Sequence, residues 1–417
     1  MQYISEQLST PIAGEYDVIV CGGGPAGAYA AISAARAGAK TLLVERMNCL
    51  GGTGTSGLVN PLFDQEGKGG LTREVVNALA EQNAWGGFRH ISFHYENMKS
   101  ILESKCIEAG VKLMFNTTFA RALTEGKKVV GIVTESVDGR MAHLGKVIID
   151  CTGDAMVAAS AGATWHMGDQ NGKCQAMTLM FLLANIPEKY NITEGLMMKE
   201  VLAEAYAKEG KGRKAPFAYP YIIPIPGTRF GTVQLTHMYD NCPLKAEEVS
   251  RAIMEGRRQM LEIFYLLKEY DPDFKDTDLI ISAPLLGVRE SRRIEGEYTL
   301  TVEDLLAGRH FEDVVATSAF NIDIHHVDST DQHTVKVPCY HIPYRCLVPK
   351  GMEGLLVAGR CISGTHEAMA SYRVQGDCSE MGEAAGLAAA EAALENKDVR
   401  DVDVKRIRSI VSKGGMY

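Results

Sequence analysis

The feature that most constrains this chain is a glycine-rich turn, Gly22-Gly23-Gly24-Pro25-Ala26-Gly27, which directly follows the run 16–21. That run is short, apolar and rich in β-branched residues, which predicts a buried parallel strand. Residues 25–37 are rich in alanine and predict a helix that ends at a left-handed cap on Gly38. A second strand is predicted over 41–45. The turn therefore lies inside a right-handed strand–helix–strand unit.

In this context the spacing of the glycines is typical of a site for the diphosphate of a dinucleotide. Gly22 allows the tight turn, Gly24 lets the backbone approach a pyrophosphate, and Gly27 allows close packing of helix on strand. The helix N-terminus adds N–H groups and a partial positive charge. Glu45 ends the second strand, which we expect to be exposed there, so its carboxylate can accept hydrogen bonds from ribose hydroxyls. A 2'-phosphate would be repelled, which argues against NADP but does not separate NAD from FAD.

Composition limits the class of protein. The chain has 417 residues, 46% of them hydrophobic and 23% charged, which is enough for two or three domains. A formal charge of -9 without a basic stripe argues against nucleic-acid binding. Residues 1–16 lack a targeting pattern and no run reaches about 18 apolar residues, so we expect no membrane span and a cytoplasmic location. None of the ten cysteines is spaced Cys-x-x-Cys, which predicts no metal site.

The pattern of apolar and polar residues changes twice in the rest of the chain. Residues 118–147 alternate apolar and polar side chains around two glycine turns, which predicts a β-meander. From about Gly162, strands alternate with long helices, and after Tyr340 the chain is glycine-rich and apolar again. We therefore expect an α/β fold, with a Rossmann-like domain of parallel sheet and β-meander and an inserted α+β substrate domain. The expected elements of these later parts are strands over 177–183, 221–226, 231–236 and 354–359, and helices over 71–81, 95–109, 194–207, 246–270 and 376–395.

Four blocks in this order resemble the FAD-dependent oxidoreductase family of the glutathione-reductase-like superfamily, and the resemblance covers nearly the whole chain. The blocks are residues 17–27 with Glu45, residues 50–53, residues 150–154, and residues 355–360 followed by 382–386. The resemblance implies one FAD-binding domain in two parts, 15–161 and 339–396, with a substrate or cap domain over 162–338 and a C-terminal tail over 397–417.

In proteins similar to this one, the glycine block binds the FAD diphosphate and the glutamate binds the adenosine ribose. A threonine–glycine turn closes over the FAD, and the last block places a strand and a helix N-terminus beside the flavin. The cofactor-binding residues implied by the resemblance are Gly22, Gly24, Pro25, Ala26, Gly27, Glu45, Arg46, Gly51, Gly52, Thr53, Thr152, Gly153, Gly359, Arg360, Val374 and Gln375.

Four residues are candidates for catalysis. Arg289 lies in an arginine cluster with Arg292 and Arg293, where one arginine is expected to face the flavin cavity while the others pair with acids. His325 is the second candidate, although a lone histidine is more often structural.

His366 and Arg373 lie between the last strand and the last helix, where distantly similar fumarate-reductase-type flavoproteins carry a histidine closely followed by an arginine. Here the gap is longer and Glu367 follows the histidine, which departs from that pattern of carboxylate binding. His366 could move a proton, and Arg373 could polarise a carbonyl or neutralise reduced flavin. The alternative for Arg373 is a plain helix entry.

The leading hypothesis is an FAD-dependent oxidoreductase that transfers a hydride between a small organic substrate and flavin N5, with a separate electron acceptor or donor. No second G-x-G-x-x-G follows a strand, which argues against a dedicated NAD(P)H domain. One alternative is the FAD-bearing subunit of an electron-transfer complex. A flavin monooxygenase is a weaker alternative, because those usually carry Gly-Asp-Ala where this chain has Gly359-Arg360. A homo-oligomer is compatible with the sequence.

Overall fold

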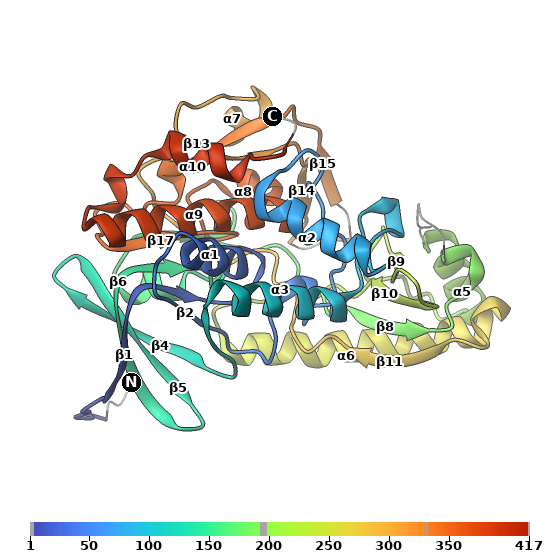
Figure 1. The fold of residues 1–417 in the computed structure, drawn as a ribbon. Coiled ribbons are helices and arrows are strands. Elements are labelled where there is room, and N and C mark those ends of the chain that lie inside the picture. Colours follow the sequence, from blue (N-terminus) through green and yellow to red (C-terminus); the bar gives the residue numbers. More distant parts are fainter. Residues whose placement is uncertain (1–3, 192–197, 328, 331, 416–417) are drawn as a thin grey trace.

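The computed structural model describes residues 4–191, 198–327, 329–330 and 332–415, and its central layer is a seven-stranded sheet (Figure 1). In spatial order the strands are β3 (Lys112–Met114), β2 (Thr41–Val44), β1 (Ile12–Cys21), β6 (Gly139–Asp150), β5 (Lys128–Ser136) and β4 (Thr118–Glu125), with β17 (Leu355–Val357) also paired to β6. Strands β3, β2, β1, β6 and β17 are parallel, whereas β4, β5 and β6 form an antiparallel meander. The predicted Rossmann-like sheet with its meander is confirmed.

The first strand–helix–strand unit has the predicted form. Helix α1 (Pro25–Arg36) begins with proline in its first turn and is followed by Gly38, whose φ is 96°. Proline suits a helix start because it lacks an N–H that would have no partner there. Strand β2 ends at Val44, one residue before the predicted end. The carboxylate of the next residue, Glu45, accepts from the backbone N–H groups of Gly23 and Met47.

Helix α9 (Gln375–Glu395) packs closely on α1, although the two lie at opposite ends of the sequence (Figure 1). A Cβ at Gly382 would lie 2.1 Å from the carbonyl oxygen of Ala26, so a side chain cannot be accommodated at this contact. The Ser33 hydroxyl donates to the carbonyl of Glu383 at 3.0 Å. Small residues thus let both helices lie against the same sheet. Helix α3 (Tyr95–Ala109) packs on α1, and helix α2 (Gly70–Glu81) packs on α3 and α9.

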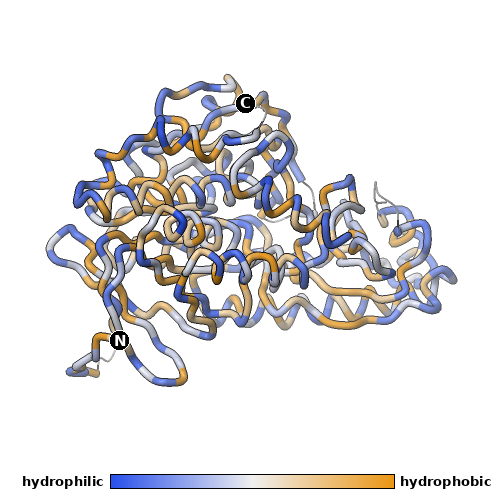
Figure 2. Tube along the Cα trace, viewed as in Figure 1, coloured by the Kyte–Doolittle hydropathy of each residue, from blue (hydrophilic) through white to orange (hydrophobic). Residues whose placement is uncertain are grey.

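A second, antiparallel sheet forms the other large part of the molecule. Its order is β11 (Asp278–Ser282), β8 (Phe181–Ala184), β10 (Phe230–Gln234) and β9 (Tyr221–Pro224). Helix α6 (Ala246–Tyr270) matches its predicted bounds, because hydrophobic and hydrophilic residues alternate along it with helical spacing (Figure 2). Helix α5 (Lys199–Glu209) packs on α6; the predicted start of α5 falls at 194–197, outside the described residues. Strand β8 starts later than predicted, since Met177 and Thr178 form isolated bridges instead.

Short elements join the two sheets. The described residues form three two-stranded ribbons: β7 (Trp165–Met167) with β12 (Arg292–Ile294), β13 (Val314–Ser318) with β16 (Tyr340–Pro343), and β14 (Ile322–His325) with β15 (Gln332–Val335). The short helices are α4 (Met156–Ser160), α7 (Val302–Leu306), α8 (His366–Tyr372) and α10 (Val404–Val411). Helix α10, within the expected C-terminal tail, packs on β13 and α9. Among the described residues, none of the helices combines the length and apolar character needed to cross a membrane.

Candidate active site

The carboxyl ends of four parallel strands meet at one edge of the central sheet. Cys21 at the end of β1 is in register with Val44 on β2 and with Asp150 on β6, and Asp150 is in register with Val357 on β17. The loops that follow these strands line one cavity of about 350 Å³. This is the edge at which open α/β sheets bind ligands.

Most of the residues predicted to bind a cofactor meet in this cavity. Gly27, Gly51 and His366 lie outside its lining. The predicted residues that line it are Gly22, Gly24, Pro25, Ala26, Glu45, Arg46, Gly52, Thr53, Thr152, Gly153, Gly359, Arg360, Val374 and Gln375, together with the catalytic candidates Arg289, His325 and Arg373.

The glycine turn leaves backbone open to the cavity. Gly22 has a φ of 93°, and a Cβ there would lie 2.5 Å from the carbonyl oxygen of Cys151. A Cβ at Gly27 would lie 1.7 Å from the carbonyl oxygen of Gly22, so Gly27 is required for packing rather than for lining. A Cβ at Gly24, in contrast, would meet no described atom within 4 Å. Helix α1 starts here without a cap from any described side chain, so its N-terminal N–H groups are suited to an anionic group.

Glu45 is not at an exposed strand end, and that expectation was wrong. Glu45 is only 6% exposed. One carboxylate oxygen accepts from the N–H of Gly23 at 2.5 Å, and the other accepts from the N–H of Met47 at 2.7 Å. The residue is buried because the end of β2 lies beneath the glycine turn. A carboxylate has about four acceptor positions, so Glu45 can still accept from a ligand while it holds the turn.

The loop after β2 returns to the glycine turn. The Gly51 N–H donates to the carbonyl of Gly23 at 2.9 Å. Gly52 has a φ of 52°, and a Cβ there would lie 2.9 Å from the Cα of Gly24. Gly51 therefore fixes the loop, while Gly52 and Thr53 line the cavity.

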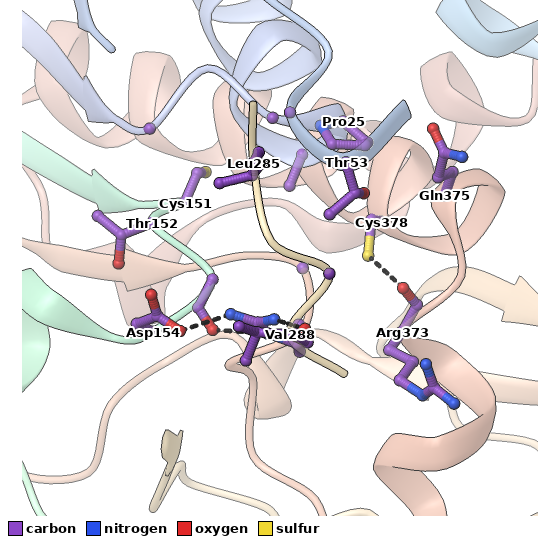
Figure 3. Close-up of a pocket in the computed structure, with 18 of the residues that line it drawn as sticks. Pro25, Thr53, Cys151, Thr152, Asp154, Leu285, Val288, Arg373, Gln375 and Cys378 are labelled. Atoms are coloured by element: carbon purple, nitrogen blue, oxygen red, sulfur yellow. Dashed lines mark hydrogen bonds and ion pairs between the residues drawn. The ribbon is translucent and has the colours of Figure 1, made fainter. Parts of the chain in front are cut away.

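Arg360 also lines this cavity. Figure 3 labels two of its partners, Asp154 and Val288. The Arg360 guanidinium pairs with Asp154 at 2.6 Å, donates from Nε to the carbonyl of Gly153 at 2.9 Å, and also donates to the carbonyl of Val288. The neighbouring Thr152 hydroxyl donates to Asp150 at 2.7 Å. Arg360 thus joins the loops after β6 and β17, and its charge is paired within the protein.

The N-terminus of α9 also faces the cavity, through Val374, Gln375 and Cys378. No side chain in the described part of the chain caps it. The Gln375 amide donates to the carbonyls of Val59 and Pro61 at 2.7 and 2.9 Å, and the Cys378 thiol donates to the carbonyl of Arg373 at 3.3 Å (Figure 3). The uncapped helix ends of α1 and α9 therefore border the same space, and both favour negative charge.

Beyond α9, the cavity ends at a charged wall. Arg373 donates to the backbone carbonyl of Asp323 at 2.9 Å and lies 3.7 Å from its carboxylate. Arg289 donates to the carbonyl of Ala176 at 2.6 Å and to the hydroxyl of Thr178 at 2.8 Å. Burial and the nearby Arg373 charge lower the pKa of Arg289 to about 9.

His325 completes this wall with its Nε2 3.4 Å from a carboxylate oxygen of Asp323. Burial and the Arg289 charge lower the pKa of His325 to about 3, so its imidazole is neutral at pH 7. Burial acts to raise the pKa of Asp323, but the hydrogen bond from His325 and the Arg373 charge hold it below its usual value. The wall therefore combines two cations, one carboxylate and a neutral histidine.

His366 lies behind the cavity. Its Nδ1 is 2.8 Å from Glu290, a buried carboxylate that also pairs with Arg293. Arg292 donates to the carbonyl of Asp154 and lies over the ring of Trp165. Of the three clustered arginines, Arg289 is thus the one that lines the cavity.

The FAD dependent oxidoreductase family matches residues 17–411. The chain belongs to this family. Among curated proteins it is similar to digeranylgeranylglycerophospholipid reductase 2 of Methanopyrus kandleri, with 27% identity over 160 residues, which are 36% of this chain and 40% of that reductase. The chain spans less than half the length of the curated relatives it matches.

Solved structures with the same fold include a geranylgeranyl bacteriochlorophyll reductase-like protein from Thermoplasma acidophilum. It has a TM-score of 0.51 and 14% identity, covering 96% of this chain and 84% of that one. The flavin-dependent brominase Bmp2 also has a TM-score of 0.51, with 16% identity, covering 94% of this chain and 81% of that one. At these identities the likeness shows the fold alone.

The geometry of this FAD-dependent oxidoreductase fits its cofactor. The cavity is open at Gly24, where a side chain would take up the space that a ligand group can occupy. The N-terminal ends of α1 and α9 border the same cavity without side-chain caps among the described residues. A long anionic dinucleotide matches both observations.

Two residues around the charged wall, Asp323 and His237, were not singled out from the sequence. Asp323 and His325 are two residues apart on β14, so strand periodicity places their side chains on one face and could have paired them. His237 carries no such signal, because its contact with His325 spans 88 residues of sequence.

Proposed function

We propose that this FAD-dependent oxidoreductase transfers a hydride between FAD and a small organic substrate bound at the wall of Arg289, Asp323, His325 and Arg373. The observation that carries the proposal is the continuity of one cavity from the glycine turn to this wall. A separate electron acceptor or donor serves the other half-reaction. FAD, when bound, supplies the hydride chemistry at its N5 position.

We further propose how the chain holds the cofactor. The N-terminus of α1 and the backbone at Gly24 bind the diphosphate, and Glu45 accepts from the adenosine ribose. The N-terminus of α9, with Val374 and Gln375, lies beside the flavin. In this scheme residues 15–161 and 339–396 form the FAD-binding domain, and residues 162–338 form the cap that supplies most of the substrate wall.

The wall residues have separate tasks in this proposal. Arg289 and Arg373 orient an oxygen atom of the substrate, because a guanidinium offers several donors in a fixed plane. Asp323 holds Arg373 in place. His325 is neutral and faces Asp323 through its Nε2, so it adds no charge to the cavity.

An anaerobic reduction assay tests the proposal. The purified, FAD-loaded chain is mixed with sugars, hydroxy acids or enoates, and its flavin absorbance is followed with both oxidised and chemically reduced protein. One class should bleach the oxidised flavin or reoxidise the reduced flavin, which also gives the direction of the reaction. If no small molecule exchanges electrons with the flavin while a reduced carrier protein does, the proposal is wrong and the chain is an electron-transfer subunit.

A further inference from the structure

A line of hydrogen bonds joins Thr178 to Asp323 through His237 and His325. His237 Nδ1 lies 3.5 Å from the Thr178 hydroxyl, and His237 Nε2 lies 3.1 Å from His325 Nδ1. His325 Nε2 then lies 3.4 Å from the Asp323 carboxylate. Both imidazoles are buried, at 2% and 3% exposure, and the ring of Phe217 stacks on His237 with centroids 4.0 Å apart. His237 itself does not line the cavity.

The end of this line at Asp323 determines where the protons lie. An ionised carboxylate can only accept, so His325 carries its proton on Nε2. A neutral His325 then has a bare Nδ1, which must accept from the Nε2–H of His237. His237 is left with a bare Nδ1 of its own, which needs a donor.

The other end of the line fits the same arrangement. The guanidinium of Arg289 can only donate, and it donates to the Thr178 oxygen at 2.8 Å. The Thr178 hydroxyl proton is therefore available for His237 Nδ1. Both ends agree on one pattern, in which each histidine is neutral and carries its proton on Nε2.

We propose that His237 is a positioning residue, which holds His325 in its neutral Nε2–H form and directs that proton at Asp323. This inference rests on the proposed function only in that His325 and Asp323 lie at the proposed substrate end. The N–H of His237 occupies the one nitrogen at which His325 could take a second proton. His325 then cannot act as a proton store, and the wall keeps a constant charge across neutral pH.

The charged groups around His325 determine the effect of replacing His237. Asp323 favours a second proton on His325, whereas Arg289 and Arg373 oppose it. The ring of Tyr239, 6.0 Å from that of His237, is a further titratable neighbour. Loss of the His237 donor frees Nδ1 of His325 while Nε2 still faces the ionised Asp323 carboxylate, so His325 should begin to titrate or exchange between tautomers.

Nitrogen NMR of the FAD-loaded, histidine-labelled protein tests the proposal directly, with His325→Gln used to assign the signals. In the wild type, His325 should remain in the neutral Nε2–H form between about pH 5 and 8. His237→Gln keeps an amide donor and should preserve this form. His237→Phe keeps the ring stacked on Phe217 but removes the donor, so the His325 signals should shift with pH or report mixed tautomers.

Two results would overturn the inference. The first is a wild-type His325 that titrates in this range or carries its proton on Nδ1, which decides the question even if His237→Phe fails to fold. The second is a folded His237→Phe variant whose His325 signals match those of the wild type.

The pH profile of flavin reduction separates positioning from a merely structural role. With the substrate found in the anaerobic assay, His237→Phe should acquire a new ionisation, with a rate that changes by about tenfold per pH unit beyond it, and His237→Gln should not. An unchanged profile despite altered NMR signals would overturn the role in the reaction. Failure of every substrate would instead count against the proposed function, and the NMR comparison would still decide for or against His237.

Discussion

Replacement of Glu45 should affect both folding and cofactor binding. Its carboxylate accepts from the N–H groups of Gly23 and Met47 at 2.5 and 2.7 Å, and the residue is 6% exposed. A hydrogen bond to a charged group contributes about 1.5 to 3 kcal/mol. Since water can enter the space left by alanine, we expect Glu45→Ala to lower the free energy of unfolding of the apoprotein by about 2 to 4 kcal/mol.

The same substitution should weaken FAD by about 1 to 3 kcal/mol, or about 5- to 150-fold, if the ribose hydroxyls also donate to Glu45. Glu45→Gln is the matched control. Its amide oxygen can accept from one of the two backbone N–H groups, while its NH₂ group faces the other donor, so its stability should lie between those of the wild type and Glu45→Ala.

Urea unfolding of the apoprotein and fluorescence titration with FAD measure the two effects separately. An unfolding free energy of Glu45→Ala within about 0.5 kcal/mol of the wild type would refute the role of Glu45 in holding the glycine turn. Unchanged FAD affinity in a variant that folds would refute its contact with the ribose.

Three further predictions concern the turn, the wall and pH. Gly24→Val should fold but retain no FAD after purification, because its side chain fills open space that the diphosphate needs. Gly27→Val should instead misfold, because a Cβ there would lie 1.7 Å from a carbonyl oxygen. A yellow Gly24→Val protein would contradict this prediction. Arg373→Lys and Arg373→Ala should both slow flavin reduction if the planar guanidinium orients substrate, but only Arg373→Ala should lower the flavin midpoint potential. Normal reduction rates and midpoint potentials in both variants would make Arg373 a structural residue. Burial lowers the pKa of His237 and His325 in the folded protein, so the unfolded chain binds more protons than the folded one below about pH 6.5. The free energy of unfolding should therefore fall as pH drops below that value, by up to about 1.4 kcal/mol per pH unit for each histidine. Urea unfolding at pH 7 and 5 checks this, and His325→Gln should reduce the slope.

Local patterns made most of the fold predictable. The apolar run before the glycine turn, the alanine-rich stretch after it and the cap at Gly38 depend on neighbours in sequence, so β1, α1 and β2 form in the predicted order. Strand β1 begins at Ile12, earlier than the predicted start at residue 16. Helix α6 matched its predicted bounds because its periodicity extends over 25 residues. Strand β8 was predicted too long, since an apolar run does not show which of its residues will find a full strand partner.

The site was less predictable because it depends on contacts between distant segments. The burial of Glu45 follows from its bond to Gly23, which closes a turn that periodicity does not describe. His366 lies near Arg373 in sequence, yet its side chain binds Glu290 behind the cavity. His237 reaches His325 only because distant segments of the chain fold together, which no local pattern encodes.

The most direct test of the central claim is anaerobic stopped-flow electron exchange between the bound flavin and the substrate identified by the anaerobic reduction assay, using wild type and Arg289→Met at matched FAD content. The claim is that one cavity holds FAD at its glycine turn and substrate at its charged wall. We expect the wild-type flavin to react in a single turnover, and the variant to hold FAD normally while its rate falls by at least about tenfold, as for loss of a hydrogen bond to a charged group. Equal rates in both proteins would contradict the placement of the substrate at this wall.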